Sequence, residues 1–296
     1  MRFGGHETFA VREDWLVKGL DLLNEDANAF KDPFVSDRLG VGRNMAKSIR
    51  HWLQVTGLVE TTKNSRSDSP TITPVGKTIL QHDPYFLHLG TWWVLHVNLV
   101  TCGTDAVAWH WFFNQFSHGR FDRIRCSADL QRQLALQGQR PPSPKTLSRD
   151  IACLLSSYAT PIPPTQEDPE DGHECPFRLL GLITYLRESD AYQLNRRKKE
   201  IPFEIVGYAF AMASPEGEDS GDSFDLNLSE AIAKPECPGR TLALDADALI
   251  SLLGEAEEAL GTDLIHTHTL GGERFVRVRG LSPSGWLEKY YLGAGR

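Results

Sequence analysis

The segment from residue 32 to residue 77 alternates short apolar patterns with glycine breaks, in an order that few folds can accommodate. Apolar spacing of three and four residues indicates helices, and Gly40-Val41-Gly42 is a tight break between two of them. The predicted elements are a short helix over 34–39, a second helix over 43–56, a hairpin over 57–73 and a helix that opens at 74. This is the order of a winged helix-turn-helix.

The second of these helices has two unlike faces. Its apolar stripe consists of Met45, Ile49, Trp52 and Leu53, and its polar stripe consists of Arg43, Lys47, Arg50, His51 and Gln54. Lys63 and Arg66 add cations at the tip of the wing. Long cations on a helix that enters a major groove contact phosphates and base edges. We therefore predict DNA contact by Arg43, Lys47, Arg50, His51, Lys63 and Arg66. A solvated charged face and a protein-interaction module are the alternatives.

Composition sets outer limits on function. The 296 residues are 41% hydrophobic and 24% charged, which is typical of a globular protein, and no apolar run is long enough to span a membrane. Neither an export signal nor paired cysteine spacing is visible, so we expect a cytoplasmic protein. The net charge of −8 is uneven, since residues 1–160 have 18 basic and 15 acidic residues and residues 161–296 have 13 and 24. Only a local patch can bind a polyanion.

The predicted fold is mainly α with small β elements. We expect a winged helix-turn-helix domain over 1–90, a helical core region over 91–200 and an α+β domain over 201–296. Helices near 127–137 and from 144 form either a second helix-turn-helix or an ordinary helical hairpin. A hairpin is predicted over 263–281, and its turn at Gly271-Gly272 pairs His266 with Arg277 and His268 with Phe275.

Two groups of residues offer chemistry. Near the N-terminus, Gly4 and Gly5 let the chain bend beside His6 and Glu7, and Arg12 and Lys18 follow. His6, Glu7, Arg12 and Lys18 could hold a phosphate or transfer a proton, and a buried polar contact that fixes the N-terminal strand is the alternative that residue chemistry favours.

The second group lies in an acidic loop. Glu170, Asp171 and Glu174 are hard oxygen ligands suited to Mg²⁺ or another divalent cation. A solvated acidic loop is the alternative that composition favours. The sequence contains no Walker-type phosphate loop and no dinucleotide fingerprint.

Several motifs together resemble a known family. They are Gly5-His6-Glu7-Thr8-Phe9 with Arg12, Trp15-Leu16 and Lys18-Gly19; Leu39-Gly40-Val41-Gly42-Arg43-Asn44-Met45; Ser48-Ile49-Arg50-His51-Trp52; Thr73-Pro74-Val75-Gly76; Asp83-Pro84-Tyr85; residues 91–99; Leu147-Ser148-Arg149-Asp150; and Cys175-Pro176-Phe177 with residues 180–183. In combination they resemble the SspB-like DNA nickase family of bacterial Ssp DNA phosphorothioation systems. The resemblance covers about the first 185 residues.

The resemblance implies a function that residue chemistry alone does not reach. It implies nicking of double-stranded DNA, so that sulfur can replace a non-bridging phosphate oxygen, in a modification that supports defence against phage. It also implies work with the cysteine desulfurase SspA, the ATPase SspC and the ATP-pyrophosphatase-like SspD. Nicking would normally require a divalent metal such as Mg²⁺. A non-catalytic winged-helix DNA-binding scaffold and a transcription regulator are the alternative functions.

Overall fold

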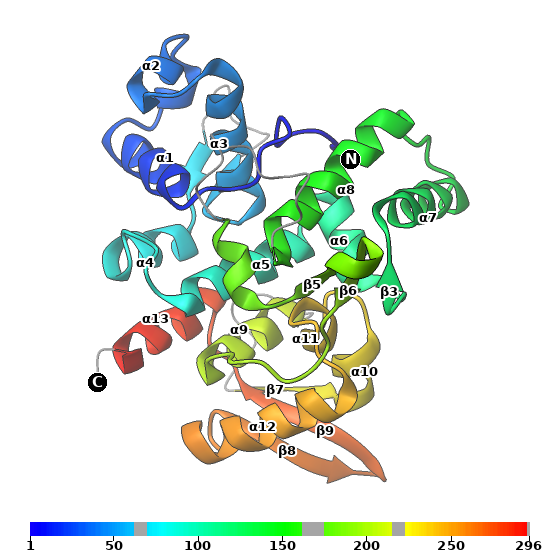
Figure 1. Cartoon of the computed structure of the whole chain (residues 1–296). Helices are drawn as coiled ribbons and strands as arrows, with labels where there is room; N and C mark the ends of the chain where they lie inside the picture. The colour runs from blue at the N-terminus through cyan, green and yellow to red at the C-terminus, as the bar shows by residue number, and fades with distance from the viewer. Residues whose placement is uncertain (62–69, 162–174, 215–222, 295–296) are drawn as a thin grey trace.

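The first part of the chain follows the predicted order of elements. The computed structural model describes residues 1–61, 70–161, 175–214 and 223–294. Figure 1 shows this part at one end of the molecule, with the N-terminal segment running toward the middle. Its elements are α1 (Glu13–Glu25), η1 (Ala29–Lys31), α2 (Val35–Leu39), α3 (Arg43–Val55), β1 (Val59–Thr61), β2 (Pro70–Ile72) and α4 (Pro74–His82). The strands β1 and β2 pair antiparallel, with Glu60 opposite Thr71.

The apolar stripe of α3 lies in the interior. Ile49, Trp52 and Leu53 are fully buried, and α3 packs against α1. The indole Nε1 of Trp52 donates to the carbonyl oxygen of Phe9 at 3.1 Å. A buried indole N–H needs such a partner, so Trp52 also fixes the backbone that precedes α1.

The middle region contains the predicted helices and a sheet that the sequence did not predict. Its helices are α5 (Leu89–Thr101), α6 (Val107–Asn114), α7 (Arg123–Leu136), α8 (Pro144–Tyr158), η4 (Pro176–Leu180) and η5 (Arg187–Ser189). The strands β3 (Arg120–Phe121), β4 (Ala159–Thr160), β5 (Ile183–Leu186) and β6 (Ala191–Leu194) form a sheet in the order β3-β6-β5-β4. Strands of two to four residues are too short to show an alternating pattern.

The last region has the predicted α+β composition. It consists of α9 (Phe203–Ala213), β7 (Ser223–Asn227), α10 (Leu228–Ala233), α11 (Pro238–Thr241), α12 (Ala246–Leu260), β8 (Ile265–Leu270), β9 (Glu273–Arg279) and α13 (Pro283–Ala294). The predicted register of the hairpin is confirmed, because His266 pairs with Arg277 and His268 with Phe275. The strand β7, which was not predicted, adds to the other edge of β9.

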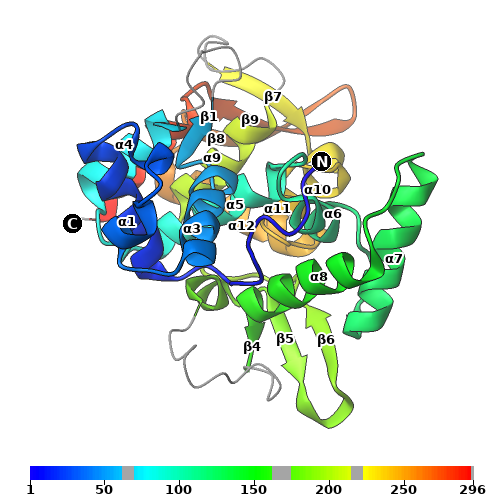
Figure 2. The same cartoon turned by 90° about the horizontal axis from the view of Figure 1, so that it is seen from above.

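Helix α5 ties the three regions together, and Figure 2 shows it inside the molecule. Every residue from Gly90 to Val100 is buried. His96 lies between the hydroxyl of Tyr158 and the carbonyl oxygen of Thr241, each at 2.8 Å. Asn98 donates to the carbonyl oxygen of Thr56 and accepts from the hydroxyl of Tyr208. One hydrophobic core therefore runs through all three regions, and the domain limits near 90 and 200 remain predictions.

The fold class is confirmed as mainly helical with small sheets. Within the described ranges, no helix has both the length and the apolar character needed to cross a membrane.

The buried His96 predicts a specific pH dependence of stability. Burial is the main cause that lowers its pKa from 6.5 to about 3. Below pH 6.5 the unfolded chain takes up a proton that the folded chain refuses, so this group makes the folded state less stable as pH falls toward 3. At pH 7.5, His96→Gln should cost about 1–3 kcal/mol in free energy of unfolding, because it disturbs two buried hydrogen bonds.

The difference in free energy of unfolding between the wild type and His96→Gln should then narrow by about 1.4 kcal/mol for each pH unit below 6. Urea unfolding of both proteins at pH 7.5, 6.0 and 5.0 measures it, and effects of the other histidines cancel in the difference. A difference that stays constant over this range would show that His96 is protonated in the folded state.

Candidate nucleic-acid interface

The outer face of α3 carries the cations that the sequence placed there. Arg43 and Lys47 are exposed, and Arg50 is half-buried one turn further along. The turn before the helix is formed by Gly40, which adopts a left-handed φ of 66°. The Lys47 ammonium lies 3.8 Å from a carboxylate oxygen of Glu7. The face opposite Trp52 is therefore open and electropositive near the start of the helix.

The predicted position of His51 on this outer face is wrong. His51 is only 3% exposed and lies under the N-terminal segment. A Cβ on Gly5 would lie 2.6 Å from its Nδ1, which shows how closely the backbone approaches the ring. Burial, together with His6 and Arg2, lowers the pKa of His51 to about 3, so the ring is neutral. A neutral buried ring cannot hold a phosphate.

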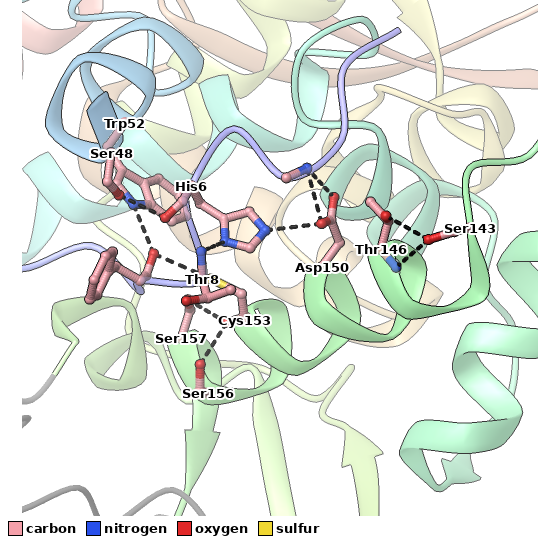
Figure 3. Close-up of polar contacts among 12 residues, drawn as sticks. His6, Thr8, Ser48, Trp52, Ser143, Thr146, Asp150, Cys153, Ser156 and Ser157 are labelled. Carbon is pink, nitrogen blue, oxygen red and sulfur yellow. Dashed lines mark hydrogen bonds and ion pairs between the residues drawn. The ribbon is translucent and has the colours of Figure 1, made fainter. Parts of the chain in front are cut away.

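His6 is the centre of a buried polar contact between α3 and α8 (Figure 3). Its Nε2 lies 3.1 Å from a carboxylate oxygen of Asp150 on α8, and its carbonyl oxygen accepts from the hydroxyl of Ser48 on α3 at 2.9 Å. The same carboxylate accepts from the amide of Gly4, which has a left-handed φ of 69°. Residues 4–8 thus form a bent segment, the N-terminal turn, held from both sides.

Both ring nitrogens of His6 are occupied. The amide of Thr8 donates to Nδ1 at 3.0 Å, so the ring proton belongs on Nε2, toward Asp150. Burial lowers the pKa of His6, whereas Cys153 and Asp150 raise it, and the net direction is upward. The hydrogen of the Thr8 amide points at Nδ1 and opposes a second proton there. His6 is only 1% exposed and has no free ring nitrogen for a substrate. This arrangement matches the alternative in which His6 forms a buried polar contact that fixes the N-terminal strand.

The other three predicted catalytic residues do not join His6. Glu7 is half-buried beside Lys47, and Lys18 forms an exposed ion pair with Asp14 at 3.0 Å. Arg12 lies over the ring of Trp15, 5.2 Å from its centroid. It lines a pocket of 530 Å³ that lies between the start of α1 and the turn before α3. The carboxylates of Asp14 and Asp37 also line that pocket and oppose an anion there.

The remaining predicted site residues lie outside the described part of the chain. They are the proposed metal ligands Glu170, Asp171 and Glu174 and the wing cations Lys63 and Arg66. In the ranges that are described, no group of three His, Cys, Asp or Glu side chains could hold a metal ion.

The sequence reasoning missed the partners of the N-terminal turn. Asp150 is 144 residues from His6, and it appeared only as the last residue of Leu147-Ser148-Arg149-Asp150. The sequence contains a weak indication that Asp150 is buried and has a distant partner. Helix α8 has an apolar stripe, and Asp150 interrupts the buried side next to Ile151. A carboxylate on the buried side of a helix requires hydrogen-bond donors from elsewhere.

Removing the charge of Asp150 should therefore destabilise the fold. Oδ1 of Asp150 faces both the Gly4 amide and the His6 Nε2, and Oδ2 faces the Gly4 amide. Asp150→Asn removes the negative charge that faces the His6 ring and places an amide N–H₂ against the Gly4 N–H, donor against donor. We expect the free energy of unfolding to fall by about 2–4 kcal/mol. Urea unfolding measures this, with Asp21→Asn on the exposed side of α1 as the matched control. Equal midpoints for the two variants would contradict a structural role for Asp150.

Comparison with known proteins identifies the family of this chain and proteins that share its fold. A family model described as a protein of unknown function (DUF4007) matches residues 3–291. No curated protein matches the chain in sequence. The chain shares its fold with a magnesium ion-bound SspB crystal structure, at a TM-score of 0.82, and with a second SspB crystal structure, at 0.81. Each is 24% identical, and the alignment covers 99% of this chain and 87% of the other. The chain therefore belongs to the DUF4007 family, and its fold is that of SspB.

Proposed function

We propose that the chain binds double-stranded DNA along the outer face of α3 and nicks one strand in a bacterial DNA phosphorothioation system. One observation carries the DNA part: Arg43 and Lys47 project from the start of a helix that follows a glycine turn, in a chain whose net charge is −8. The nicking part rests on the family resemblance of the sequence motifs and on the fold shared with SspB.

The proposed contact is mainly electrostatic. Duplex DNA carries a dense row of phosphates, and each neutralised phosphate releases counterions, which favours binding at low salt. Arg43 and Lys47 are one helical turn apart, so both can reach the same groove. The acidic side chains of residues 161–296 would repel the duplex. A bound duplex should therefore lie against the N-terminal half.

The chemical part of the proposal has fewer candidate residues than the sequence suggested. His6 would position the N-terminal turn rather than act on DNA, because its two ring nitrogens are engaged. Glu7 is the signature residue nearest to the DNA face, through its contact with Lys47, and we propose it for proton handling. Mg²⁺ as the cofactor, with Glu170, Asp171 and Glu174 as ligands, remains a prediction. We also propose SspA, SspC and SspD as partners.

A DNA-binding scaffold without catalysis is the second candidate. The burial of His6 favours it, because a sealed imidazole cannot act on DNA. Such a scaffold would position the sulfur-transfer proteins on DNA.

Removal of the α3 cations should weaken DNA binding. In Arg43→Gln/Lys47→Gln, two phosphate contacts are lost while helix propensity is retained. Affinity for a duplex at 0.1 M salt should fall on the order of tenfold or more, and the slope of log K against log salt should become shallower by about 2. Fluorescence anisotropy measures both, with Arg274→Gln/Arg279→Gln on β9 as the matched control. Unchanged binding in the α3 variant would exclude α3 as the contact.

Plasmid relaxation separates the nickase from the scaffold. The wild type should convert supercoiled plasmid to the open circle with Mg²⁺ and not with chelator. Arg43→Gln/Lys47→Gln should relax it on the order of tenfold more slowly, because less DNA is bound. No open circle at high protein concentration, with duplex binding intact, would establish the scaffold instead. Relaxation that persists in chelator would exclude the metal dependence.

A further inference from the structure

A second group of basic residues lies on α7, on α8, on the loop between them and on β3, well outside the predicted recognition helix. Between residues 118 and 149 the chain has seven Lys and Arg residues against two acids, in a protein whose net charge is −8. All seven basic side chains are exposed. They are Arg120, Arg123, Arg125, Arg132, Arg140, Lys145 and Arg149.

Within the described ranges, few carboxylates pair with these cations. In the described part of the molecule, only Arg132 has an ion pair, with Asp129 at 3.1 Å. Asp129 also pairs with His118, and Asp122 accepts from the backbone amide of Arg125 as the cap of α7. Both acids of this stretch are therefore occupied. Among the residues that the structure describes, six of these cations have no carboxylate partner. We name them the α7–α8 surface: Arg120, Arg123, Arg125, Arg140, Lys145 and Arg149.

The fold holds the α8 part of this surface, with Lys145 and Arg149, beside α3. Figures 1 and 2 both show α8 between α3 and α7. The N-terminal turn is bonded to both helices, by Ser48 on α3 and by Asp150 on α8. Lys47 and Arg149 are the sequence neighbours of these two anchors. Lys145 and Arg149 lie four residues apart, on the exposed stripe of α8, while Leu147 and Ile151 face the core.

The chemistry of the surface fits phosphates better than a protein partner. Five of its six cations are arginines, whose planar guanidinium binds phosphate oxygens through two hydrogen bonds. A protein interface needs an apolar centre. The strongly exposed apolar side chains of α7 are Ile124 and Leu136, which lie at opposite ends of the helix, about 18 Å apart at 1.5 Å per residue. They do not form a patch.

We propose that the α7–α8 surface binds the phosphate backbone of the same DNA duplex that lies on α3, so that the duplex crosses the N-terminal turn. This inference rests on the proposed DNA binding and extends it to a second contact. The rigid joint at His6 would keep the two contacts in fixed register, and the second contact adds affinity without reading sequence.

The test measures duplex binding by the full chain as a function of salt. We compare the wild type with Lys145→Gln/Arg149→Gln and Arg123→Gln/Arg125→Gln, using a labelled 30-base-pair duplex. Each double variant should bind on the order of tenfold more weakly at 0.1 M salt, with a salt slope shallower by about 2. The charge-conserving variant Lys145→Arg/Arg149→Lys should bind as the wild type does. Arg274→Gln/Arg279→Gln again serves as the control for a change in net charge.

Two results would overturn the inference in different ways. If both surface variants keep wild-type affinity and slope while Arg43→Gln/Lys47→Gln loses binding, α3 alone holds DNA. The proposed function then survives, and the α7–α8 surface is excluded as a DNA contact. If the wild type fails to bind the duplex at all, the proposed function and this inference fail together. Circular dichroism and the melting temperature of each variant separate lost contacts from lost folding.

Discussion

The hydrogen bond between His6 and Asp150 is the contact on which the arrangement of the N-terminal half depends. The buried carboxylate on α8 must be matched by donors, and it receives them from the amide of Gly4 and the ring of His6. The backbone of the same turn accepts from Ser48 on α3. A single bent segment therefore satisfies polar groups on two helices at once, and it cannot shift without leaving a buried charge unpaired.

Charge is distributed over the fold in a way that a net value hides. The exposed cations of α3, α7 and α8 lie in the first 160 residues, where basic residues outnumber acidic ones by 18 to 15. The last region is strongly acidic, with 13 basic and 24 acidic residues over 161–296. Because like charges repel a polyanion, under the proposed function this separation would orient DNA toward the N-terminal half of the molecule.

Local patterns in the sequence predicted what depends on neighbours along the chain. The register of β8 and β9 follows from the two glycines of their turn. The caps of α8 and α12 are likewise local, since Ser143 and Asp245 each accept from an amide three residues on. Contacts between distant segments could not be predicted in the same way. His51 has the helical spacing of an outward residue, but the N-terminal turn covers it. The partners of His6 depend on the packing of α8, which no spacing within residues 1–60 encodes.

The N-terminal signature therefore fixes the backbone between α3 and α8 through His6. Its glycines allow the bend and the close approach to His51, and its His6 is buried in a hydrogen bond with Asp150. Glu7 is the half-buried acid of this segment, 3.8 Å from Lys47. A phosphate bound by Lys47 would compete with that carboxylate, so under the proposed function duplex binding is coupled electrostatically to the turn. Asp150 bonds the same turn to α8. Under the proposed function, DNA bound on α3 is therefore coupled through the turn to the position of the second basic surface.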